Sequence, residues 1–193
     1  MNNKTETTIS KIFKKIFKGQ EKLEYLILLP RLKLFVEECD GSKNIMDAKD
    51  VFDNIGSEFK DCCVDEKRLA TKKTHVCVYD LKKDATFMQM FSSLNTDLRK
   101  LCFTQHQIIN FVIENRYHEE LDFSHRTNYF LLESHGRFFI VWVWIGFVRV
   151  DIFDSMTIFC SIHKSPIEDP NVVLGSDRGC MRHQIIVPQL VLV

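Results

Sequence analysis

The chain has 193 residues, of which 45% are hydrophobic and 27% are charged, and these proportions are typical of globular proteins. A chain of this length can bury a sizeable core without disulfides or metal, so disorder over most of its length is not expected. Its 26 basic and 26 acidic residues give a formal net charge of zero. This balance argues against a protein that binds nucleic acid over its whole surface.

The charge is nevertheless uneven along the chain. Residues 1–33 carry 8 basic and 3 acidic residues, whereas residues 34–66 carry 3 basic and 10 acidic residues. Such blocks either neutralise one another within one fold or indicate a basic arm that docks on an acidic partner or membrane. Both interpretations stay open at this stage.

The cysteines and the apolar runs bear on the compartment. The seven cysteines are odd in number, and most lie in apolar periodic stretches, where a free cysteine acts as a small hydrophobe. We see no secretory signal, so a reducing cytoplasm is expected. The longest nearly apolar run, residues 138–148, is too short to span a bilayer as a helix, so no transmembrane segment is expected.

Residues 1–40 are predicted to form a basic, amphipathic helical arm. Between residues 7 and 18, isoleucine and phenylalanine recur at helical spacing and lysines occupy the other face. A second helical stretch is expected from about 21 to 39, and Pro30 is expected to kink or split it. The predicted contact residues, toward a protein partner, a second copy or a membrane surface, are Lys11, Lys14, Lys15, Lys18, Phe13 and Phe17.

The next part of the chain, up to Tyr117, is also predicted to be mainly helical. A helix capped by Asp47 is expected to carry the apolar positions from Val51 to Cys63 on one face. Helices are also expected from Asp84 to Leu94 and from Asn95 or Thr96 to Cys102. Thr104 and Gln107 form a capping box for one more helix. Residues 75–79 are a short strand in this half.

After Tyr117 the pattern changes to a period of two. Residues 129–133 and 138–145 are predicted to form a β-hairpin around a turn with Gly136, and Gly146 is expected to mark a break or bulge. Further strands are expected at 157–163 and 184–187, separated by a long loop at 164–181, and Pro188 places the last strand near an edge. Trp142 and Trp144 share one face of their strand and valines share the other, so this strand is covered on both sides.

These patterns predict an α+β fold in which a helix-rich N-terminal half packs on a C-terminal antiparallel sheet, with residues 41–193 as one domain. The segments TQHQIINFV (104–112), FLLESHGRFFIV (130–141) and RHQIIVPQL (182–190) resemble a group of uncharacterised small proteins from uncultured bacteria. That resemblance covers roughly residues 50–150 and the last ten. It implies no established activity, so no residue takes a role from it.

The candidate metal site consists of two C-x-x-H units, Cys160 with His163 and Cys180 with His183. Zinc accepts two cysteines and two histidines, but Cys160 and His163 are expected on a strand, where positions three apart face opposite ways.

A nucleophilic triad of Cys102, His118 or His125, and Asp122 is an arbitrary choice among many such sets. There is no Gly-rich phosphate loop, and no cofactor is expected. We assign no catalytic residue.

Residues 95–116 followed by the 129–145 hairpin also have the order of a winged helix. The would-be recognition helix offers Gln105, Gln107, Asn110 and Arg116 but no lysine, which weakens this interpretation because DNA affinity depends on phosphate neutralisation. The leading hypothesis is therefore a non-enzymatic protein-interaction module that uses the basic arm and a sheet edge at Val187–Val193. A winged-helix nucleic-acid binder is the alternative, and a metal- or thiol-dependent enzyme is the third hypothesis.

Overall fold

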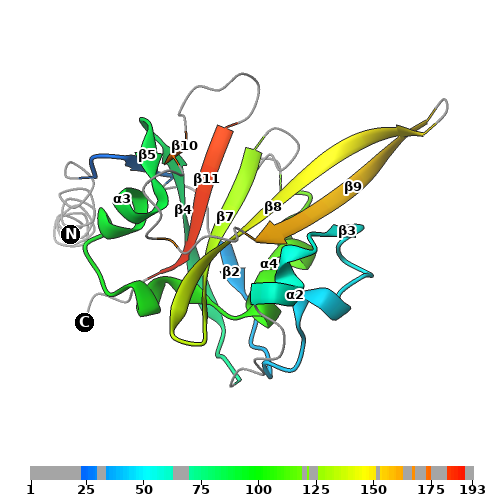
Figure 1. Ribbon diagram of the computed structural model, residues 1–193, viewed down its shortest axis with the longest axis horizontal. Helices are drawn as coiled ribbons and strands as arrows, with labels where there is room; N and C mark the ends of the chain where they lie inside the picture. Colours follow the sequence, from blue (N-terminus) through cyan, green and yellow to red (C-terminus); the bar gives the residue numbers. More distant parts are fainter. Residues whose placement is uncertain are drawn as a thin grey trace, which may run out of the picture.

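The computed structural model describes residues 23–29, 34–62, 70–118, 121, 126–150, 153–162, 167, 173–174 and 182–189. Within these ranges the protein is built on a nine-stranded mixed sheet (Figure 1). The strands of the main path, in spatial order, are β1 (Leu26–Leu28), β4 (Thr74–Leu81), β11 (Arg182–Pro188), β7 (Arg126–Ser134), β8 (Arg137–Val150), β9 (Phe153–Ile162) and β3 (Asn54–Ile55). In addition, β2 (Leu34–Val36) pairs with β4, and β6 (Cys102–Phe103) pairs with β7. A separate pair joins β5 (Ala85–Thr86) to β10 (Val173–Leu174).

The predicted fold class is wrong. Strands make up most of the regular structure of the described chain, and its α-helices are three short ones: α2 (Glu58–Cys62), α3 (Phe87–Ser92) and α4 (Gln105–Asn115). The sheet is also mixed rather than antiparallel, because β11 and β6 run parallel to β7 and β3 runs parallel to β9.

The helix predicted between residues 21 and 39 is replaced by two edge strands along β4. Leu28 pairs with Tyr79 and Leu34 pairs with Val76. Between these two pairs the chain advances by six residues, whereas β4 advances by only three. Residues 30–33, which include Pro30, lie outside the described residues. Two runs of three residues are too short for periodicity to separate strand from helix.

The single helix predicted from Asp47 to Cys63 is also wrong. A 3-10 helix, η1 (Ile45–Asp47), ends at Asp47 instead, and its cap is Asn44, whose side chain accepts from the backbone N–H of Asp47 at 3.0 Å. A turn, β3 and α2 follow. The predicted apolar face is nevertheless directed inward, since Val51, Phe52 and Phe59 are all buried.

The middle of the chain agrees better with the sequence patterns. Strand β4 lies where a strand was expected, and Thr104 and Gln107 form the predicted capping box of α4. The helix predicted after Asp84 is shorter and is capped by Thr86. The short helix after it is a 3-10 helix, η2 (Leu98–Leu101), capped by Asp97.

The predicted hairpin is confirmed as β7 and β8. His135 and Gly136 both have positive φ, of 51° and 73°, as a two-residue type I′ turn requires. The break expected at Gly146 is wrong, because β8 continues to Val150 and Gly146 pairs with Thr157 of β9 in unbroken register. The two strands extend together away from the rest of the sheet (Figure 1); we call residues 144–157 the ribbon.

The last strand lies inside the sheet, so its predicted place at an edge is wrong. Strand β11 pairs with β4 on one side and with β7 on the other. Its pairing with β7 ends at Ile186, which lies opposite Phe130. From Leu131 onward, β7 pairs with β6 instead. Pro188 is the final residue of the strand, where its missing N–H removes no bond toward β7.

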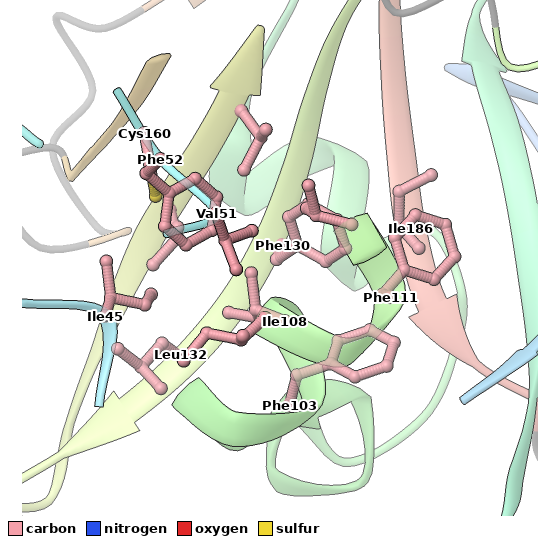
Figure 2. Packing of buried hydrophobic residues seen from close by; sticks show 14 of the residues in the cluster. Ile45, Val51, Phe52, Phe103, Ile108, Phe111, Phe130, Leu132, Cys160 and Ile186 are labelled. Carbon is pink, nitrogen blue, oxygen red and sulfur yellow. The ribbon is translucent and has the colours of Figure 1, made fainter. Parts of the chain in front are cut away.

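Two apolar clusters cover the two faces of the sheet. Phe130 and Leu132 of β7 belong to one cluster, and Tyr129 and Leu131 belong to the other, so the clusters lie on opposite faces. Helix α4 covers the first face. Figure 2 shows its Ile108 and Phe111 among Phe130, Leu132 and Ile186. Helix α3 and η2 supply residues to the second cluster, and Trp142 packs against it, so the predicted cover on both sides of β8 is confirmed.

Candidate functional site

The predicted contact residues of the N-terminal arm, Lys11, Lys14, Lys15, Lys18, Phe13 and Phe17, lie outside the described residues. The basic amphipathic helix therefore stays a prediction. In the part of the chain that the structure describes, no helix has the length and apolar character needed to cross a membrane.

The described members of the two C-x-x-H units are far apart. Cys160 is 1% exposed in the first apolar cluster, and burial raises the pKa of its thiol well above the usual value. His183 lies on the other face, where its Nδ1 is 3.1 Å from the Tyr129 hydroxyl. Strands β7 and β8 separate the two. His163 and Cys180 lie outside the described residues, within which no three His, Cys, Asp or Glu side chains form a metal-binding group.

The proposed triad is not assembled by its described members either. Cys102 lies in β6, before α4, and His118 follows the end of that helix. A helix of eleven residues spans about 16 Å, so thiol and imidazole stand at opposite ends of it. His125 and Asp122 lie outside the described residues.

Helix α4 buries two of the four residues that the winged-helix interpretation assigned to recognition, whereas Asn110 and Arg116 are partly exposed. Gln105 and Gln107 are each 5% exposed. The Gln105 side-chain oxygen accepts from the Ile45 N–H at 2.9 Å, and Gln107 completes the capping box. The two glutamines are therefore not available to contact a nucleic acid, which weakens the winged-helix interpretation without testing it.

A cavity of about 410 Å³ lies between α2 and the β7–β8 turn. Its lining side chains are Asp61, Cys62, Ser134, His135, Arg137 and Phe139. The Ser134 hydroxyl lies 3.0 Å from Nδ1 of His135. The sequence did not single out this cavity because α2 and the turn are some seventy residues apart. Its lining contains a thiol and an imidazole, together with charges of both signs, which favour no particular ligand.

A buried polar ladder crosses three central strands on the face covered by α4. Asp80, Gln184 and Asn128 are neighbours in register on β4, β11 and β7. Arg126 donates to Asp80 Oδ1 at 2.8 Å, and Gln184 donates to the same oxygen at 3.0 Å. The charges are thus balanced within the ladder. The two hydrogen bonds to Asp80 connect β7, β4 and β11, which indicates a role in setting strand register.

The outer edge of β9 is closed over part of its length. Gly56 donates to the Cys160 carbonyl at 2.9 Å, and the Asp53 carboxylate accepts from the Ile158 N–H at 2.7 Å. The backbone groups of these even-numbered residues therefore point away from β8. Because N–H and C=O groups alternate sides along an antiparallel strand, those of Asp154 and Met156 also point outward. Within the described chain, no strand pairs with β9 on this side between residues 153 and 157.

The same alternation fixes the outer edge of β8. Ile158 pairs with Ile145, and the register continues unbroken to Val150, so the backbone groups of Ile145, Phe147 and Arg149 point away from β9. The ladder of β8 with β7 ends at Val143. Among the described residues, no strand pairs with this edge from 144 to 150. The ribbon thus offers a seven-residue edge on β8 and a five-residue edge on β9.

Comparisons with protein-family models, curated proteins and solved structures found no match to this chain. A function must therefore be argued from the geometry of the chain itself.

Proposed function

We propose that this chain is a non-enzymatic protein-interaction module that binds by adding a strand to its ribbon. The contact surface differs from the edge predicted at Val187–Val193, because β11 is paired on both sides. The observation that carries the proposal is the edge of β8 from residue 144 to 150, which has no strand partner among the described residues. Backbone N–H and C=O groups on such an edge are a template for another strand.

The shape of the ribbon also supports the proposal. It extends away from the body of the sheet as two strands (Figure 1), and a two-stranded hairpin alone is at best marginally stable in water. A third strand on the β8 edge would supply backbone hydrogen bonds and additional packing. A partner therefore stabilises the part of the fold to which it binds.

We also propose that the module works in the cytoplasm. Among the described residues, Cys39, Cys77 and Cys160 are free thiols. Free thiols persist in a reducing compartment, whereas secreted proteins of this size commonly form disulfides.

The test removes the ribbon and keeps the body of the sheet. Residues 147–156 are replaced by Asn-Gly, which joins Gly146 to Thr157. The backbone groups of this pair face each other, so a two-residue type I′ turn can close it. The tagged full chain and the shortened variant are used for capture from cells that encode the protein, and cross-linking mass spectrometry then locates the contact. Partners should cross-link to the ribbon and be lost from the shortened variant.

A matched control changes the opposite edge of the sheet. Ile27 in β1 is 51% exposed, so Ile27→Lys removes a large apolar side chain there without disturbing the core. This variant should capture the same partners as the full chain. Equal capture by the ribbon-shortened variant, or cross-links confined to other elements, would contradict the proposal.

A further inference from the structure

The open edge of β8 has a register in which it pairs with itself. When two copies meet antiparallel about Phe147, residue 145 lies opposite 149 of the other copy and 146 lies opposite 148. The backbone N–H and C=O groups of Ile145, Phe147 and Arg149, which point away from β9, then face the same groups of the other copy. Every residue from 144 to 150 has a partner in this arrangement, and the two ribbons become one four-stranded sheet.

We propose that the partner at this edge is a second copy of the chain, paired antiparallel about Phe147; this inference rests on the proposed function. The contact is isologous, as expected for a twofold dimer, because both copies contribute the same seven residues. The resulting strand order is β9, β8, then β8 and β9 of the partner copy. The ribbon is no longer an isolated hairpin in this assembly.

The charge of the chain favours a second copy over a strongly charged partner. The formal net charge is zero and the sequence pI is about 7.0, so two copies do not repel each other at neutral pH, and such a balance promotes association. The ribbon itself contains one basic residue, Arg149, and two acidic residues, Asp151 and Asp154. Neither an acidic nor a basic peptide is selected by so small an imbalance.

The edge of β9 is the less suitable of the two. Strand β3 occupies it at residues 159–160, and the Asp53 carboxylate occupies the N–H of Ile158. A strand added to the β9 edge could pair with only the five residues from 153 to 157 before it reached the Asp53 carboxylate and β3. A charged side chain that satisfies an edge donor is a usual means of limiting edge-to-edge pairing.

A pair of proline variants tests the inference. Phe147 and Met156 lie directly opposite each other in the ribbon, and the N–H of each points outward, toward the β8 edge and the β9 edge respectively. Phe147→Pro and Met156→Pro therefore remove one donor from one edge each and leave the bonds between β8 and β9 in place. Light scattering coupled to size-exclusion chromatography gives the mass of each variant over a range of about 1 to 200 μM, where weak complexes dissociate.

The full chain and Met156→Pro should form dimers with dissociation constants that agree within about twofold. Phe147→Pro should weaken the dimer by about tenfold or more. The ribbon-shortened variant should be monomeric; it serves as a second test in case Phe147→Pro does not fold. A full chain that stays monomeric at the highest concentration, a dimer that survives shortening, or a dimer lost only in Met156→Pro would each overturn the second-copy inference. The capture experiment still decides the proposed function in those cases.

Discussion

Replacing Arg126 by Met should destabilise the fold several times more than replacing Arg99 by Met. Both arginines pair with a carboxylate. Arg126 Nη1 lies 2.8 Å from Asp80 Oδ1, with side-chain exposures of 15% and 24%. Arg99 Nε lies 3.5 Å from Glu133 Oε1, and the Arg99 side chain is 68% exposed. The same substitution therefore tests one type of ion pair at two levels of burial.

The magnitude follows from what each substitution leaves behind. Removing one partner of a buried pair costs about 3–5 kcal/mol because the remaining charge is desolvated. Asp80 is partly exposed and keeps a hydrogen bond from Gln184, so we expect a loss of about 2–4 kcal/mol in the free energy of unfolding. For Arg99, solvent screening reduces the loss to about 1 kcal/mol or less.

Urea unfolding at neutral pH, followed by the fluorescence of Trp142 and Trp144, measures both losses. Combining Arg126→Met with Asp80→Asn in a double-mutant cycle isolates the interaction between the two side chains. If the losses in the free energy of unfolding for Arg126→Met and Arg99→Met agreed within about 0.5 kcal/mol, the polar ladder would not stabilise the pairing of its strands. A coupling energy near zero in the cycle would refute the argument in the same way.

Three further predictions concern single positions. Burial lowers the pKa of His106, although the Asp40 carboxylate 3.2 Å away opposes this shift, so the folded state favours the neutral ring. The stability that is present above about pH 6.5 should therefore fall on acidification, by at most about 1.4 kcal/mol per pH unit. His106→Gln should flatten this pH dependence of the free energy of unfolding in urea titrations. Gly56→Ala would place a Cβ 2.2 Å from the Ser161 hydroxyl oxygen and should cost about 1–3 kcal/mol in thermal or urea unfolding, with partial recovery when Ser161→Gly is added. Gly136→Ala meets no atom within 4 Å but keeps φ at +73°, so its loss should be about 1 kcal/mol and should not respond to Ser161→Gly.

Local signals were sufficient where one short segment determines its own geometry. The capping box of Thr104 and Gln107 requires only four residues, and it is present as predicted. The hairpin turn requires a residue that tolerates positive φ, and Gly136 supplies it. Both features depend on neighbours in sequence, so the amino-acid pattern predicts them without knowledge of the rest of the fold.

The errors occur where long-range pairing decides the backbone. Leu26–Leu28 and Leu34–Val36 become strands because β4 offers them an edge, and nothing within residues 21–39 indicates this edge. Val51, Phe52 and Phe59 were correctly predicted to face inward, but two short elements and a turn place them there rather than one helix. An apolar spacing of three or four thus predicted burial better than it predicted helix.

The site was harder to predict than the core because strand order determines it. Pro188 suggested an edge for the last strand, yet β6 replaces β11 beside β7 at Leu131, so the proline ends a central strand without leaving a gap. The exposed edge is instead formed by the unbroken run of β8 past Gly146. The sequence signal for it was present, since residues 147–152 continue the alternation of the hairpin, but Gly146 was interpreted as a break.

Asp53 shows how the two edges of the ribbon come to differ. Its carboxylate accepts from Ile158, at the level where β9 leaves the body of the sheet, and β3 occupies the next two positions. A strand that approached β9 would have to stop at this carboxylate, whereas a strand on β8 meets no comparable side chain before Val143 among the described residues. Under the proposal of a second copy, this asymmetry favours addition to the β8 edge, and an edge that pairs with its own copy forms a closed twofold dimer. A β9 edge that was open over its full length would instead allow β8 of one copy to pair with β9 of the next, a head-to-tail contact that continues without limit.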